Sequence, residues 1–145
     1  METGEIVRDV KIAAPPEVVF SFLTDPEKLT RWQAARADVD LQIGGEYQMA
    51  IAGEHVARGT FIEIDPPRKL VYTFGWEGHG IVQPGSTKIE ITLEPDGDYT
   101  ILHFVHSGLP TDEEVASHTH GWEHYLSRLE VAARGDDPGP DPMEA

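Results

Sequence analysis

The feature that most constrains the fold of this chain is a series of short alternating segments between residues 38 and 106. Residues 39–43 and 46–51 alternate apolar and polar side chains on either side of two glycines, and the pattern recurs around the turn at residues 95–98. Alternation with a period of two predicts strands with one buried face. Short turns between consecutive strands predict an antiparallel meander of about six strands. Residues 5–12 predict one further strand before it.

Helices are predicted on both sides of the meander. A proline start signal and the apolar spacing after it predict a short helix over residues 16–24. Asp25, or the threonine before it, is suited to cap a second, brief helix. Thr111 and Glu114 form a capping box, which predicts a long amphipathic helix from there to about residue 134.

These elements predict a single α+β domain over residues 1–135. It consists of a curved antiparallel sheet of about six or seven strands, two short helices and one long C-terminal helix. Residues 136–145 mix acidic residues with glycine and proline, which predicts a disordered acidic tail. The chain of 145 residues contains no cysteine, so one packed core must supply its stability.

Charge and composition restrict the partners that we expect. The chain has 11 Lys and Arg against 26 Asp and Glu, a formal net charge of −15. Such a surface repels phosphate backbones, so we expect no nucleic-acid partner. The N-terminus lacks the pattern of a signal peptide, and no apolar run is long enough to insert into a membrane. We therefore expect a cytoplasmic protein, with a homodimer through exposed sheet edges left open.

A single helix covering a strongly curved sheet leaves volume that bulky side chains must either fill or line. The sequence places many aromatic residues on the predicted inner faces, and it leaves the choice between lining and filling open. If they line a cavity, they are the groups that would hold an apolar or aromatic ligand. The predicted ligand-binding residues are Trp32, Tyr47, Phe61, Tyr72, Phe74, Trp76, Phe104, His118, Trp122 and Tyr125. The glycine-rich residues 75–85 are either a lid over this cavity or an ordinary hairpin turn.

Histidines are the candidate catalytic residues. His106 at the end of the last strand and His118 on the long helix could act together as general acid and base beside the cavity. The alternative for His106 is a structural role, in which it holds the turn between the last strand and the helix. His120 and His124 have a spacing that can chelate a metal, but they fall on the flanks of the helix, so we expect no metal and no cofactor.

Five segments resemble the SRPBCC superfamily of START-like and birch-allergen-like proteins, and within it the AHSA-like group, homologues of the activator of heat-shock-protein ATPase. The segments are residues 12–20, 23–32, 59–73, 106–110 and 121–126. The resemblance implies the helix-grip fold, in which the sheet wraps around the C-terminal helix.

Three functions are weighed for the chain. The leading hypothesis is a non-catalytic protein that binds a small hydrophobic or aromatic molecule between sheet and helix. The second is an enzyme of the cyclase or dehydratase type known in the superfamily, acting on an aromatic or polyketide-like substrate through the two histidines. The third is regulation of a chaperone ATPase by protein contact, as the resemblance implies.

Overall fold

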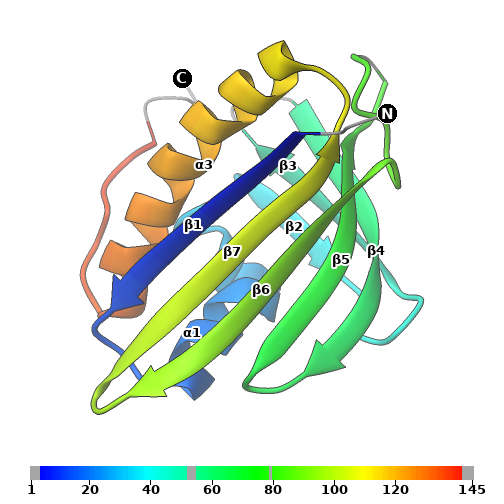
Figure 1. The fold of residues 1–145 in the computed structure, drawn as a ribbon. Helices are drawn as coiled ribbons and strands as arrows, with labels where there is room; N and C mark the ends of the chain where they lie inside the picture. The colour runs from blue at the N-terminus through cyan, green and yellow to red at the C-terminus, as the bar shows by residue number, and fades with distance from the viewer. Residues whose placement is uncertain (1–3, 52–54, 79, 142–145) are drawn as a thin grey trace.

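The computed structural model describes residues 4–51, 55–78 and 80–141, and it has the α+β architecture that the sequence predicts (Figure 1). The elements along the chain are β1 (Gly4–Ile12), α1 (Pro16–Thr24), α2 (Pro26–Leu29), β2 (Arg36–Val39), β3 (Glu46–Ile51), β4 (His55–Asp65), β5 (Lys69–Trp76), β6 (Thr87–Asp96), β7 (Tyr99–Leu109) and α3 (Asp112–Ala133).

Within these described residues, seven strands form one antiparallel sheet in the order β1-β7-β6-β5-β4-β3-β2. Strands β2 to β7 follow one another as a meander. Strand β1 pairs with β7, for example Ile6 with His106. The register between β4 and β5 shifts between Phe61 and Glu63, and irregularities of this kind bend a strand. The sheet is therefore curved, and its inner face holds the core.

Helix α3 lies along the β1 side of the sheet and closes the concave face (Figure 1). Its N-terminus is capped as predicted, because the Thr111 side chain accepts a hydrogen bond from the Glu114 backbone N–H at 3.1 Å. The inner stripe of α3 is buried against the sheet and α1. On the rim, Arg8 of β1 forms an ion pair with Glu123 of α3 at 2.8 Å.

The predicted strand over residues 39–43 is wrong in its position. Strand β2 ends at Val39, and residues 40–45 form a turn in which the Gly45 N–H donates to the Gln42 carbonyl at 2.8 Å. Leu41 and Ile43 are exposed. The alternation of apolar and polar residues here is typical of a strand, but the segment lies outside the sheet and neither Leu41 nor Ile43 is buried.

The segment after α3 runs back along the helix (Figure 1). Arg128 donates to the carbonyls of Pro138 at 3.4 Å and Gly139 at 3.0 Å. The Asp141 carboxylate accepts from the Tyr125 hydroxyl at 2.8 Å and lies 2.9 Å from Nε2 of His124. We call residues 136–141 the C-terminal strap. The predicted tail also includes residues 142–145, which lie outside the described part, and a domain boundary at residue 135 stays a prediction.

In the part of the chain that the structure describes, no helix has the length and apolar character needed to cross a membrane.

Candidate functional site

A cavity of about 300 Å³ lies between strand β5, helix α3 and the loop that follows β5. Phe74 and Trp76 form the wall on β5. The facing wall comes from one side of α3, with His118, Gly121, Trp122 and Tyr125. We call this space the aromatic cavity. Its volume is at the lower end of the roughly 300–1,000 Å³ typical of small-molecule sites.

The loop between β5 and β6 closes one side of the aromatic cavity. Gly80, Ile81 and Val82 line it, with Val82 buried and Ile81 exposed. The Trp76 backbone N–H donates to the Val82 carbonyl at 2.7 Å, so the loop folds back onto the end of β5. The position of this loop fits the lid interpretation, which remains a prediction. Its residue 79 lies outside the described residues.

Gly121 is the lining residue of helix α3 that carries no side chain. It sits in the middle of the helix, and a Cβ built on it would meet no atom within 4 Å. Glycine inside a helix costs about 1 kcal/mol relative to alanine. A methyl group at this position would meet open space, so packing does not require the glycine, which lowers helix stability.

His106 lies beneath the cavity in a continuous chain of hydrogen bonds. The Trp122 indole N–H donates to its Nδ1 at 3.0 Å. Its Nε2 lies 2.8 Å from Oγ1 of Thr87, whose hydroxyl donates to the Phe74 carbonyl at 2.6 Å. These partners assign the proton of a neutral ring to Nε2. Burial, with a smaller contribution from His118, lowers the pKa of His106 to about 3.

His118 has both ring nitrogens occupied as well. Its Nδ1 lies 2.8 Å from the backbone carbonyl of Glu114, one helical turn earlier. Its Nε2 accepts from the indole N–H of Trp76 at 3.0 Å. This bond holds the Trp76 ring across the cavity toward α3. In this arrangement neither His118 nor His106 presents a free nitrogen to a molecule in the cavity.

The other end of the sheet's concave face is filled by side chains. The rings of Tyr47 and Tyr72 meet edge to face with centroids 5.2 Å apart, and Phe61 packs against both. Only a void of about 10 Å³ remains among them. The Tyr47 hydroxyl donates to the Thr73 carbonyl at 2.7 Å. Burial raises the pKa of both tyrosines, so each keeps its proton.

The ten predicted ligand-binding side chains therefore separate into three groups. One group lines the aromatic cavity: Phe74, Trp76, His118, Trp122 and Tyr125. A second group surrounds the small void: Trp32, Tyr47, Phe61 and Tyr72. Phe104 lines neither space and packs against the Trp122 ring, with centroids 4.6 Å apart.

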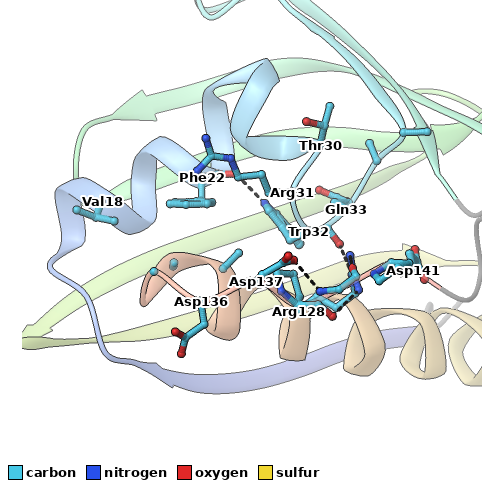
Figure 2. A pocket seen from close by; sticks show the side chains of 18 residues that line it. Val18, Phe22, Thr30, Arg31, Trp32, Gln33, Arg128, Asp136, Asp137 and Asp141 are labelled. Atoms are coloured by element: carbon cyan, nitrogen blue, oxygen red, sulfur yellow. Dashed lines mark hydrogen bonds between the residues drawn. The ribbon is translucent and has the colours of Figure 1, made fainter.

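A larger groove of about 720 Å³ lies on the surface between α1, the segment after α2 and the C-terminal strap (Figure 2). Figure 2 shows Arg128 beneath the strap, where its Nε donates to the Trp32 carbonyl at 3.0 Å. Charged side chains such as Arg31 and Asp136 line the groove. The Arg128 guanidinium in this groove already donates its hydrogen bonds to backbone carbonyls. We therefore regard the smaller aromatic cavity as the better site for a ligand.

Sequence reasoning missed six residues of the aromatic cavity: Gln33, Ile51, His55, Glu114, Ser117 and Gly121. The signal for Gly121 was a glycine at the centre of a strongly predicted helix. Gln33 carries no comparable signal, because a polar residue after a short helix is typical of surface loops. His120, in turn, is exposed, and His124 faces the strap. Within residues 4–51, 55–78 and 80–141, no three His, Asp or Glu side chains gather to hold a metal ion.

The fold and the cavity together define a helix-grip protein, a curved antiparallel sheet closed by one long helix, with a partly open pocket between them. The chain belongs to the family described as "Activator of Hsp90 ATPase homolog 1-like protein", whose sequence profile matches residues 13–134. This family is part of the SRPBCC superfamily, so the resemblance seen in the sequence is confirmed.

Solved structures agree with this assignment. An AHSA1-like protein from Rhizobium etli is 47% identical, with 97% of this chain and 88% of that protein covered and a TM-score of 0.79. CalU16 from Micromonospora echinospora is 26% identical over 92% of this chain and 78% of its own, with a TM-score of 0.76. An Hsp90 activator from Plasmodium falciparum shares the fold at 23% identity, over 88% of this chain and 94% of its own, with a TM-score of 0.75.

A curated relative, an uncharacterized protein from Schizosaccharomyces pombe, is 21% identical over 131 residues, or 90% of this chain. The chain spans 38% of the length of that relative.

Proposed function

We propose that this chain binds a small, predominantly apolar ligand with a ring-shaped body in the aromatic cavity. The observation that carries the proposal is a partly open pocket of about 300 Å³ walled by Phe74, Trp76 and Trp122, with Gly121 adding no side chain on the helix wall. It is about twice the roughly 150 Å³ of an apolar cavity that stays dry and binds benzene. The size therefore suits a molecule of two or three fused rings.

The hydrogen bonding of the two histidines favours binding over chemistry. A general acid or base must present a proton or a lone pair to the substrate. His106 is fully buried, and its ring nitrogens face Trp122 and Thr87. His118 is engaged by Trp76 and by the carbonyl of Glu114. These contacts support a role in holding the cavity walls, and they favour the binding hypothesis over the cyclase or dehydratase hypothesis.

The test compares two substitutions at one position. Gly121→Ala adds a methyl group on the helix wall of the cavity, whereas Gly121→Phe adds an aromatic ring that competes with a ligand for the same space. The full chain and both variants are screened by thermal shift against naphthalene, flavonoid and steroid compounds. A ligand at a hundred times its dissociation constant adds about 2.7 kcal/mol, which raises the melting temperature by several degrees.

We expect the same compounds to stabilise the wild-type chain and Gly121→Ala, and to leave Gly121→Phe unchanged. Circular dichroism of the ligand-free variants checks that both are folded. A compound that stabilises Gly121→Phe as much as the wild type binds elsewhere. A screen without any hit in the wild-type chain contradicts the proposal.

A second candidate function is regulation of an Hsp90-type ATPase through protein contact. It is favoured by the description of the family and by the Hsp90 activator among the related structures. The full chain is added to a purified Hsp90-type chaperone, and ATP hydrolysis is followed. A several-fold acceleration that saturates with added chain supports this function, and an unchanged rate at saturating concentration contradicts it.

A further inference from the structure

Gln33 is a buried amide beside the aromatic cavity. It follows α2, its backbone N–H donates to the Leu29 carbonyl at 3.0 Å, and the residue is only 3% exposed. Its side chain makes no hydrogen bond to any other residue that the structure describes, and the residue borders the aromatic cavity, the small void beside Tyr72 and the groove shown in Figure 2. An amide side chain carries two donors and one acceptor oxygen. Buried polar groups are nearly always paired, so an unpaired one calls for a partner.

The other enclosed polar groups on the cavity wall are already used within the protein. The indole N–H groups of Trp76 and Trp122 donate to the two histidines. The Tyr125 hydroxyl donates to the Asp141 carboxylate of the C-terminal strap. Gln33 thus stands out on the described wall as a buried side chain with unused hydrogen-bonding capacity at the border of the aromatic cavity.

We propose that Gln33 selects the ligand by hydrogen bonding, and that the ligand is a neutral ring system with one carbonyl, amide or hydroxyl group. This inference rests on the proposed binding function and specifies the chemistry of the ligand. Desolvating an apolar molecule with one polar group is unfavourable in the cavity unless that group finds a partner. The Gln33 amide provides both a donor and an acceptor for it.

The charge of the surroundings excludes an anionic ligand of the fatty-acid or aromatic-acid type. No Lys or Arg is found among the described residues that line the aromatic cavity. The Glu114 carboxylate lies on the same wall, and the whole chain carries a formal net charge of −15. A carboxylate entering this space would lose its hydration without gaining a cation. A neutral carbonyl incurs no such loss.

A buried water is the alternative partner for Gln33. Gln33 also borders the void of about 10 Å³ beside Tyr72, whose hydroxyl lacks a hydrogen-bond partner among the described residues. A water molecule needs a space of about 10–15 Å³ and several polar partners. If one water joined these two groups, Gln33 would have no preference to impose on a ligand. The experiment must separate these two partners.

Three naphthalenes of nearly equal shape provide the test. Isothermal titration calorimetry measures the affinity of 2-acetylnaphthalene, of its apolar analogue 2-isopropylnaphthalene and of the anion 2-naphthoate. The proteins are the wild-type chain, Gln33→Leu and the control Gln42→Leu, which changes an exposed glutamine in the turn after β2. Thermal unfolding of the ligand-free proteins is recorded alongside.

We expect the wild-type chain to bind 2-acetylnaphthalene roughly 5–10-fold more tightly than 2-isopropylnaphthalene, which is the usual net effect of one hydrogen bond. The carboxylate should bind more weakly than either. Gln33→Leu should abolish the preference for the ketone and raise the melting temperature of the ligand-free protein, because it removes an unpaired buried amide. Gln42→Leu should retain the preference.

The outcomes separate this inference from the function on which it rests. If none of the naphthalenes binds the wild-type chain, or if all bind Gly121→Phe equally well, the proposed function fails and the inference with it. If both neutral naphthalenes bind with equal affinity, or if the preference survives in Gln33→Leu, only the role of Gln33 is overturned. Tightest binding of 2-naphthoate overturns the assignment of a neutral ligand.

Discussion

Acid should destabilise this fold through a single buried histidine. His106 is neutral in the folded protein, where burial and the nearby His118 lower its pKa to about 3. In the unfolded chain the same side chain titrates at about 6.5. Between these two values the unfolded state binds a proton that the folded state does not bind. Stability from His106 is therefore fully present above pH 6.5 and is lost as the pH falls toward 3.

The size of the effect follows from the difference between the two pKa values. Each pH unit below 6.5 removes about 1.4 kcal/mol from the free energy of unfolding, so the loss at pH 4.5 is about 2.7 kcal/mol. The full loss, near pH 3, is about 5 kcal/mol. Domains of this kind have total stabilities of about 5–15 kcal/mol. One histidine would thus account for a large part of the acid sensitivity.

The measurement is urea unfolding at pH 7.5, 5.5 and 4.5, followed by tryptophan fluorescence, for the wild-type chain and His106→Asn. Both proteins share the same carboxylates, so the difference between their free energies of unfolding isolates His106. We expect the wild type to lose about 2.7 kcal/mol more than the variant between pH 7.5 and pH 4.5. The exposed His120→Asn serves as control and should follow the wild type. A constant difference between wild type and His106→Asn would refute the reasoning.

Three further predictions concern the periphery of the fold. His103 bridges the carboxylates of Glu94 and Asp9, and the hydrogen bond to Glu94 contributes most to raising the pKa of His103. The stability that this bridge contributes is therefore present below about pH 6.5 and is lost at higher pH. In urea unfolding at pH 6 and pH 8, His103→Gln should remove this difference, which is under about 1 kcal/mol at an exposed site. A chain ending at Gly135 lacks the strap carbonyls that Arg128 binds, and calorimetry should show a loss of roughly 1–3 kcal/mol; an unchanged melting temperature contradicts this. In Gly75→Ala the new Cβ would collide with the Gln83 backbone, so limited proteolysis should cut the β5–β6 loop faster than in the wild type.

The sequence predicts those parts of the fold that depend on local pattern. The alternation around residues 87–106 gives the strands β6 and β7, and the capping box at Thr111 gives the start of α3 to within a residue. The prediction fails at residues 39–43. Alternation indicates which side chains would share a face of a strand, but it does not indicate whether a neighbouring strand is present to form a sheet that buries this face. Leu41 and Ile43 alternate in a turn.

Which of the inward-facing aromatic residues line the cavity and which fill the core could not be predicted from the alternation of side chains or from composition. Tyr72, Phe74 and Trp76 alternate along the same face of β5, yet Tyr72 packs into the filled end and the other two line the aromatic cavity. The difference depends on where the sheet bends and where α3 lies across it. Both are set by contacts between residues far apart in the sequence. Gln33 shows the same limit, since only the tertiary structure encloses its amide.

The two ends of the concave face differ in a way that stability alone does not explain. Around Tyr47 and Phe61 the rings pack with almost no void, as expected for a core that stabilises the fold. Around Gly121 the protein keeps a glycine inside a helix, an open space and the unpaired amide of Gln33, and each of these lowers stability. Selection for stability would have replaced Gly121 with alanine, since the space for its methyl group is present. Three destabilising features at one place are consistent with a function that requires them. A bound molecule that occupies the open space and forms a hydrogen bond with the Gln33 amide would remove two of the three, the space and the unpaired amide.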